Sequence, residues 1–171
     1  ELGSVDILVN NAGTIRRAPM LEYTEKDWDD VLDINLRALF FLSQAAARVM
    51  DKQGGGKIIN IASMLSFQGG ILVPSYTAAK SAVAGLTRAQ ANELAGKNIN
   101  VNAIAPGYMA TDNTAPLRAD EKRNAAILDR IPAGRWGDPD DLKGLVTFLA
   151  SDAAAYMHGS IVPLDGGWPA R

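Results

Sequence analysis

The feature that most constrains the fold of this sequence is a regular alternation of short apolar runs with longer helical patterns. Four short runs are typical of buried parallel strands, and they span residues 5–10, 57–63, 99–105 and 160–164. Strands that alternate with helices in this way form a parallel sheet with helices on both faces. We therefore predict an α/β fold built on a doubly wound, Rossmann-like parallel sheet.

Capping residues and apolar periodicity place four helices between these strands. Thr24 is expected to cap the first helix, because Asp27 follows it three residues later. Pro139 stands in the first turn of the last helix, a position that proline tolerates. The expected helices span residues 24–50, 76–97, 120–130 and 139–150.

Four strands are fewer than the roughly six or seven that such a sheet usually has, and no G-x-G-x-x-G pattern links a strand to a helix. The glycines at 54–56 follow a helix, so we expect a hairpin-like turn there. We interpret residues 1–171 as a single partial Rossmann-like domain, the C-terminal part of the fold without its N-terminal βαβαβ unit. The connection at about residues 107–137 is unusually long, which suggests an inserted substrate loop.

Charge and composition exclude several classes of protein. A formal net charge of −2, without a block of like charges, argues against nucleic acid or an anionic membrane as a partner. No apolar run approaches the ~18 residues of a membrane span. With no cysteine and a single histidine, His158, the sequence predicts no metal site and no catalysis by histidine. The lack of cysteine also fits a reducing, cytoplasmic setting, and it fits many exported bacterial proteins as well.

The candidate catalytic residues are a serine, a tyrosine and a lysine. Ser63 ends the second strand, where open parallel sheets bind ligands, and could donate a hydrogen bond to a substrate oxygen. Tyr76 and Lys80 are four residues apart, which places them on one face of a helix. An ammonium about 6 Å from a phenol would lower the pKa of the phenol by about 2. We therefore expect Tyr76 to act as a general acid and base, as carbonyl reduction requires.

The spacing of these residues resembles the signature of the short-chain dehydrogenase/reductase family: Ser63, twelve residues, then Tyr76-Thr77-Ala78-Ala79-Lys80. Three further segments resemble that family in the same order along the chain: Asn10-Asn11-Ala12-Gly13, Asp33-Ile34-Asn35-Leu36, and Pro106-Gly107 followed by Thr111. The resemblance implies an NAD(P)-dependent enzyme that moves hydride between a nicotinamide cofactor and a carbonyl or alcohol carbon of a small-molecule substrate.

The resemblance also implies a role for each segment. The segment after the first strand steadies the sheet and contacts the adenosine side of the cofactor. Asn35 holds a water in a proton relay to Lys80 through a local distortion of its helix. The implied catalytic residues are Asn35, Ser63, Tyr76 and Lys80. The implied cofactor-binding residues are Asn10, Ala12, Gly13, Tyr76, Lys80, Pro106, Gly107 and Thr111.

NAD is the implied cofactor, with NADP as the alternative. The residue that normally selects between them follows the second strand of the complete sheet, in a segment that this sequence does not contain. The glycine turn and helix N-terminus that bind the pyrophosphate are also missing from it. We therefore expect this chain by itself to bind the cofactor weakly or not at all.

Four further segments resemble members of the family that act on sugar acids such as 2-dehydro-3-deoxy-D-gluconate. These segments are Arg16-Arg17 and residues 106–114, 131–137 and 165–168. A sugar acid carries a carboxylate, which a guanidinium can bind through two parallel hydrogen bonds. The expected substrate-binding residues are Ser63, Tyr76, Arg16 and Arg17.

Other functions remain open. The chain is alternatively another reductase of the family, acting on gluconate or on 3-ketoacyl groups, or an isomerase or dehydratase that uses the same tyrosine. It is also consistent with a non-catalytic fragment that kept an oligomer surface. Two expected helices carry more apolar residues than one sheet face can cover, and the resemblance implies that they pair in a homotetramer. These apolar residues are Leu39, Phe40, Phe41, Leu42, Val83 and Leu86.

Overall fold

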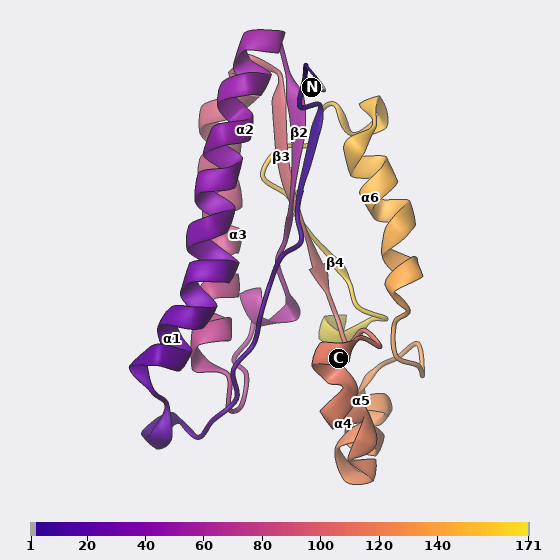
Figure 1. Ribbon diagram of the computed structural model, residues 1–171. Coiled ribbons are helices and arrows are strands. Elements are labelled where there is room, and N and C mark those ends of the chain that lie inside the picture. Colours follow the sequence, from indigo (N-terminus) through magenta and orange to yellow (C-terminus); the bar gives the residue numbers. More distant parts are fainter. Residues whose placement is uncertain (1–2, 171) are drawn as a thin grey trace.

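The computed structural model describes residues 3–170 and contains a fully parallel sheet in the order β1-β2-β3-β4 (Figure 1). Each strand begins and ends within two residues of its predicted position, and the predicted fold class is confirmed. The strands are β1 (Ile7–Asn10), β2 (Gly56–Ile61), β3 (Ile99–Pro106) and β4 (Ile161–Leu164).

Helices cover both faces of this sheet (Figure 1). Helices α2 (Leu39–Gln53) and α3 (Pro74–Leu94) lie on one face, and α6 (Lys143–Ala150) lies on the other. Side chains alternate between the faces along β2: Ile58 packs with residues of α2 and α3, whereas Ile59 packs with Leu149 of α6. Strand β3 is buried on both sides, as expected of a central parallel strand.

The first predicted helix is correct at its start but not continuous, because its middle has the local distortion that the resemblance implies at Asn35. Thr24 caps α1 (Glu25–Leu32), because its side chain accepts a hydrogen bond from the Asp27 N–H at 3.1 Å. A π-helical turn (Asp33–Ala38) then separates α1 from α2. Within it, the side-chain amide of Asn35 donates to the Val31 carbonyl at 3.0 Å, so a side chain takes an acceptor of the preceding helical turn.

Two other expectations about local structure need correction. The glycines after α2 do not form a hairpin-like turn; Gly54 has a left-handed conformation (φ 93°) and ends the helix, because its N–H donates to the Met50 carbonyl. The segment at 107–137 contains the expected helix, α5 (Glu121–Arg130), and also a short helix that we did not predict, α4 (Ala115–Ala119). Five residues are too few to show apolar periodicity.

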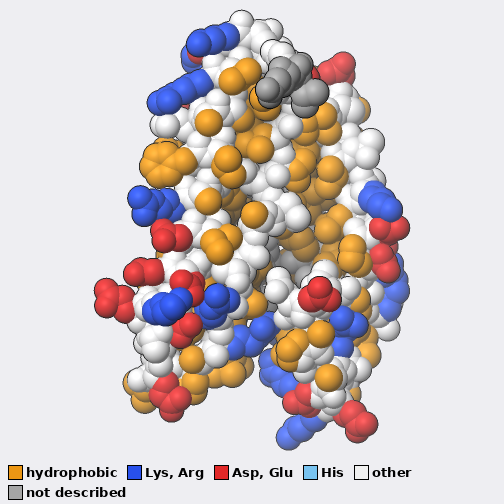
Figure 2. Space-filling view, viewed as in Figure 1, with side chains coloured by type: hydrophobic (Ala, Val, Ile, Leu, Met, Phe, Trp, Pro, Cys, Tyr) orange, Lys and Arg blue, Asp and Glu red, His pale blue; other side chains and the backbone are white. Residues whose placement is uncertain are grey.

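Strand β1 lies at the edge of the sheet, and part of its apolar surface is open. Ile7 is 48% exposed and Val9 is 39% exposed. Figure 2 shows hydrophobic side chains along the hollow between the two helical layers on this side of the molecule. Within residues 3–170, no helix has the length and apolar character needed to cross a bilayer.

Candidate active site

The residues singled out from the sequence lie at one edge of the sheet, because the carboxyl ends of parallel strands point the same way. Asn10 ends β1, Ser63 follows the end of β2 by two residues, and Pro106 ends β3. Tyr76 and Lys80 come from the first two turns of α3, which begins after the loop that follows Ser63.

The structure brings Ser63, Tyr76 and Lys80 together. The Lys80 ammonium nitrogen lies 5.5 Å from the centroid of the Tyr76 ring, as the spacing of four residues predicted. The Ser63 side chain lies close enough to the Tyr76 side chain to lower the pKa of the phenol. These contacts leave a hydroxyl, a phenol and an amine adjacent to one another at the edge where ligands bind in this class of fold.

The protonation of the pair differs from our expectation. We expected Lys80 to lower the pKa of Tyr76, but burial raises the pKa of Tyr76 above 10.0. This effect outweighs the neighbouring Ser63 side chain and the positive charge of Arg17, which both lower the pKa. Burial also lowers the pKa of Lys80 from 10.5 to about 8. The Lys80 amine is only 4% exposed and donates to the Ile61 carbonyl at 2.6 Å.

Ser66 links the backbone of Ser63 to that of Lys80, a role that the sequence did not reveal. Its hydroxyl oxygen accepts from the Ser63 N–H at 3.3 Å and donates to the Lys80 carbonyl at 2.6 Å. A single side chain therefore fixes the distance between the turn after β2 and the second turn of α3. The only signal in the sequence is the spacing of two serines three residues apart, which is typical of a cap.

Asn35 lies in the π-helical turn and is almost fully buried, with 1% exposure. Its side chain donates to the Thr14 carbonyl at 2.8 Å and accepts from the Thr14 N–H at 3.1 Å. This pair of bonds attaches the segment after β1 to the helix. Gly13 allows the close approach, since a Cβ there would lie 2.8 Å from the Asn35 amide oxygen.

Asn10 belongs to the interior rather than to the surface. Its side-chain amide donates to Asn60 and to Ser43, each at 2.8 Å, and so ties β1 to β2 and α2. The residues that follow it, Ala12 and Gly13, are exposed at the sheet edge. Asn10 therefore steadies the sheet, while the backbone of the next residues is open to a ligand.

The segment after β3 approaches the C-terminal strand very closely. The Gly107 N–H donates to the Leu164 carbonyl at 2.9 Å, and a Cβ on Gly107 would lie 2.6 Å from the Asp165 Cα. Only glycine fits at this position. Thr111 begins the next turn, where its N–H donates to the Thr114 hydroxyl at 3.1 Å.

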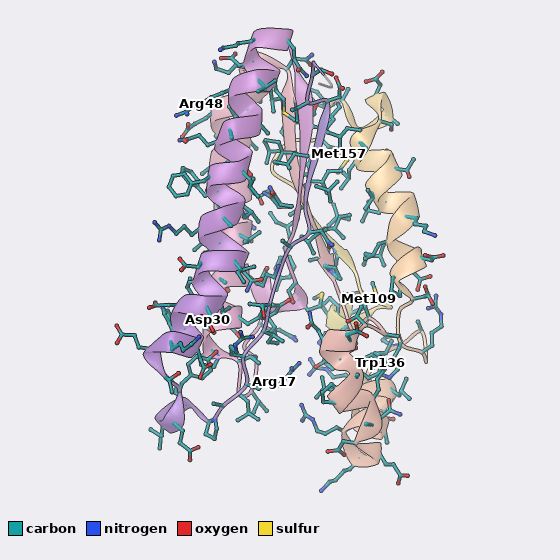
Figure 3. All side chains as sticks on the ribbon, viewed as in Figure 1. Arg17, Asp30, Arg48, Met109, Trp136 and Met157 are labelled. Atoms are coloured by element: carbon teal, nitrogen blue, oxygen red, sulfur yellow. The ribbon has the colours of Figure 1, made fainter. Side chains whose placement is uncertain are left out.

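The two candidate arginines have different environments. Arg16 is paired with acidic residues of α1, at 3.3 Å from Asp30 and 3.8 Å from Asp27. Arg17 donates to the main-chain carbonyl of Asn113 at 2.9 Å, and no carboxylate partner for it is found within residues 3–170. Figure 3 shows Arg17 projecting from the segment after β1 toward α4 and α5. Of the two, Arg17 is the cation available to an anionic ligand.

Known proteins are similar in sequence to this chain over all the residues that form the site. A family model described as Enoyl-(Acyl carrier protein) reductase matches residues 1–169. The chain is 67% identical to the 2-dehydro-3-deoxy-D-gluconate 5-dehydrogenase of Escherichia coli (strain K12), over 100% of this chain and 68% of the relative. It is 61% identical to the protein of the same name from Bacillus subtilis (strain 168), over 100% of this chain and 67% of the relative.

The solved structures lead to the same family. A gluconate 5-dehydrogenase from Burkholderia cenocepacia, in complex with NADP and tartrate, is 40% identical with a TM-score of 0.98, over 100% of this chain and 67% of that chain. The chain thus spans about two thirds of the length of the relatives it matches. Because the family model and these relatives cover nearly every residue, the chain belongs to the short-chain dehydrogenase/reductase family, a family of NAD(P)-dependent oxidoreductases.

Proposed function

We propose that this chain forms the catalytic part of an enzyme that transfers hydride between NAD(H) and a hydroxyl or keto carbon of a sugar acid such as 2-dehydro-3-deoxy-D-gluconate. The observation that carries the proposal is the convergence of Ser63, Tyr76 and Lys80, with the charge of Arg17 acting on Tyr76. Relatives from Escherichia coli and Bacillus subtilis are named for that sugar acid. The tartrate bound by the Burkholderia relative is a small dicarboxylate, which supports an anionic substrate.

Tyr76 exchanges the proton in this proposal. During oxidation the substrate hydroxyl gives its proton to the Tyr76 oxygen while its carbon loses a hydride, and during reduction the phenol returns the proton. Ser63 donates a hydrogen bond that holds the substrate oxygen beside Tyr76. The Lys80 amine, with its pKa lowered to about 8, can gain and lose a proton near neutral pH and so restore the state of Tyr76. Asn35 holds the water that links Lys80 to solvent.

When bound, the nicotinamide cofactor accepts or supplies the hydride. The residues present fit such a group, because Ala12 and Gly13 are small and exposed at the edge of the sheet where this class of fold binds ligands. We assign these two, with Asn10 beneath them, to the adenosine side. The nicotinamide side is assigned to Tyr76, Lys80, Pro106, Gly107 and Thr111. NAD is the proposed cofactor, and NADP is the alternative because the Burkholderia relative binds it.

The proposed assembly is a homotetramer in the cytoplasm. Phe40, Phe41 and Leu42 of α2 are 37–54% exposed, and a groove between α2 and α3 continues this apolar surface. Two residues that we expected on this surface, Leu39 and Val83, are instead buried against the sheet. Light scattering of the full-length protein is expected to give four times the protomer mass. A monomeric mass at micromolar concentration would contradict this assembly.

The function is tested by measuring the nicotinamide absorbance during turnover with either cofactor and with several substrates. We expect the highest kcat/KM with 2-dehydro-3-deoxy-D-gluconate, above gluconate and 3-ketoacyl substrates. Arg17→Ala is expected to raise the KM for the sugar acid about 10-fold to 100-fold, because a charge-assisted hydrogen bond is worth about 1.5–3 kcal/mol. Equal activity of Arg17→Ala and the wild type would remove Arg17 from the binding site.

The matched control for this variant is Arg48→Ala. Arg48 is an exposed arginine of α2, and Figure 3 shows it on the outer side of that helix, far from Arg17. The Arg48→Ala variant removes the same charge from the protein at a position away from the proposed substrate site. Because Arg48 lines a groove between α2 and α3, light scattering must show that the variant keeps the wild-type mass. A comparable rise in KM for Arg48→Ala would assign the effect to net charge rather than to a contact with the substrate.

A further inference from the structure

The backbone on both sides of Arg17 is tied to the start of α3. The Ala18 N–H donates to the Leu72 carbonyl at 3.1 Å. The Tyr23 hydroxyl donates to the Arg16 carbonyl at 3.3 Å and is hydrogen-bonded to the Ser75 hydroxyl. Because a carbonyl can only accept, Ser75 must donate to the Tyr23 oxygen while Tyr23 donates to Arg16.

Both attachment points lie within the four residues before Tyr76. Ser75 is fully buried and precedes Tyr76 by one residue, so its position is fixed by the same helical turn. Leu72 has a left-handed backbone (φ 67°), which costs a branched residue about 1–2 kcal/mol. Its side chain is 46% exposed, so side-chain burial does little to offset that cost. The Leu72 carbonyl accepts the hydrogen bond from Ala18, so this strained residue is one of the two points that attach the Arg17 segment.

These two backbone attachments flank Arg17, whose contacts differ from those of the neighbouring Arg16. Arg16 is held by Asp30 and Asp27, which fixes the loop to α1. Arg17 is exposed, uses one guanidinium nitrogen for the Asn113 carbonyl, and exerts its charge on Tyr76. A guanidinium has five N–H donors, so Arg17 keeps donors for a second acceptor.

From this arrangement we infer that Tyr23 is a positioning residue that sets the Arg17 guanidinium relative to Tyr76, and thereby sets the preference of the enzyme for anionic substrates. The inference rests on the proposed function, in which Arg17 binds the substrate carboxylate. A carboxylate held by Arg17 lies at a fixed distance from the reacting carbon only if Arg17 and Tyr76 share one frame. The Tyr23 hydroxyl holds them in that fixed arrangement through its bonds to the Arg16 carbonyl and to Ser75, and the Ala18–Leu72 bond adds a second attachment.

The test is Tyr23→Phe in the full-length protein, which removes one hydroxyl and keeps the ring. The measurements are kcat and KM for 2-dehydro-3-deoxy-D-gluconate, and the inhibition constants of tartrate and of threitol, its uncharged counterpart. We expect KM and the tartrate inhibition constant to rise about 3-fold to 10-fold, as the loss of one hydrogen bond implies. The value of kcat should stay within about twofold, and the threitol inhibition constant should not change.

Tyr156→Phe is the matched control, since Tyr156 is fully exposed and should leave every constant unchanged. Ser75→Ala gives an independent test, because it keeps the bond from Tyr23 to Arg16. Ser75→Ala should raise the tartrate inhibition constant less than Tyr23→Phe does, and it should leave the threitol inhibition constant unchanged. Adding Tyr23→Phe to Arg17→Ala should not raise the tartrate inhibition constant any further, because the guanidinium that Tyr23 positions has already been removed.

Two results would overturn the inference. One is an equal loss of affinity for tartrate and threitol in Tyr23→Phe and in Ser75→Ala, which would indicate a general structural role. The other is a loss of tartrate-binding free energy in the Tyr23→Phe, Arg17→Ala double variant that equals the sum of the losses in the two single variants. A failure of the proposed function looks different: Arg17→Ala would then leave tartrate inhibition unchanged, whatever Tyr23→Phe does.

Discussion

Tyr76→Phe in the full-length protein is expected to lower kcat by about 10²–10⁴-fold, the usual contribution of a positioned proton donor and acceptor. Phenylalanine fills the same half-buried space and keeps the ring 5.5 Å from the Lys80 amine, so the fold should tolerate it. The lost group is the hydroxyl that lies beside Ser63. Because that hydroxyl acts on the substrate proton, and the other residues assigned to the nicotinamide side are unchanged, cofactor affinity should change by less than about twofold.

The measurement combines steady-state rates with a fluorescence titration of the cofactor. Ser63→Ala provides the comparison, because it removes the neighbouring hydroxyl and leaves the phenol in place. A Tyr76→Phe variant that retains more than about a tenth of the wild-type kcat would exclude Tyr76 as the proton-transfer group. Turnover of substrate without any change in nicotinamide absorbance would favour an isomerase or a dehydratase instead.

Lys80→Met is expected to lower kcat by about 10²-fold or more and, at the same time, to abolish a pH dependence of stability. The folded protein holds Lys80 with a pKa of about 8, below its ordinary value of 10.5. The unfolded chain therefore binds more protons, and the free energy of unfolding must rise with pH across that window. Between pH 7.5 and 9.5 the wild type should gain about 2 kcal/mol from this residue.

Urea unfolding of both proteins at pH 7.5, 8.5 and 9.5, at one protein concentration, measures this difference. Tyr76 does not interfere, because burial raises its pKa above 10.0, so any stability that it loses on ionisation is lost above this range. Methionine is unbranched and of similar length, which limits the change in packing. If Lys80→Met and the wild type gain stability in parallel, other groups carry the pH dependence and Lys80 is not the buried amine that the structure describes.

Local signals in the sequence were sufficient to predict the strands, the start of the first helix and the proximity of Tyr76 to Lys80. Thr24 and Asp27 form a cap from contacts within four residues, and the structure has the same cap. Tyr76 and Lys80 meet because any helix places residues four apart together. The carboxyl ends of the strands converge in any parallel sheet, which explains why Ser63 and Pro106 could be assigned to one edge.

The remaining features depend on contacts between distant segments, which a single sequence does not reveal. Arg16 and Arg17 are adjacent and chemically identical, and only the position of Asp30 on α1 separates their roles. The pKa of Tyr76 depends on how deeply α3 and the loop before it bury the phenol, and this effect exceeds that of the charges nearby. The role of Tyr23 depends on Ser75, which is 52 residues away along the chain.

The buried amides between β1 and β2 have a consequence for how reliably this sheet assembles. Asn10 and Asn60 are partners in the parallel register, and their side chains are hydrogen-bonded to each other at 2.8 Å, while Asn60 also donates to Thr87 of α3 at 3.0 Å. A shift of one residue would turn one of them to the opposite, apolar face and leave its amide without a partner, at about 1–3 kcal/mol per unsatisfied group. A misaligned sheet is thus penalised once the helices cover both of its faces, because a buried amide without a partner has also lost its hydrogen bonds to water.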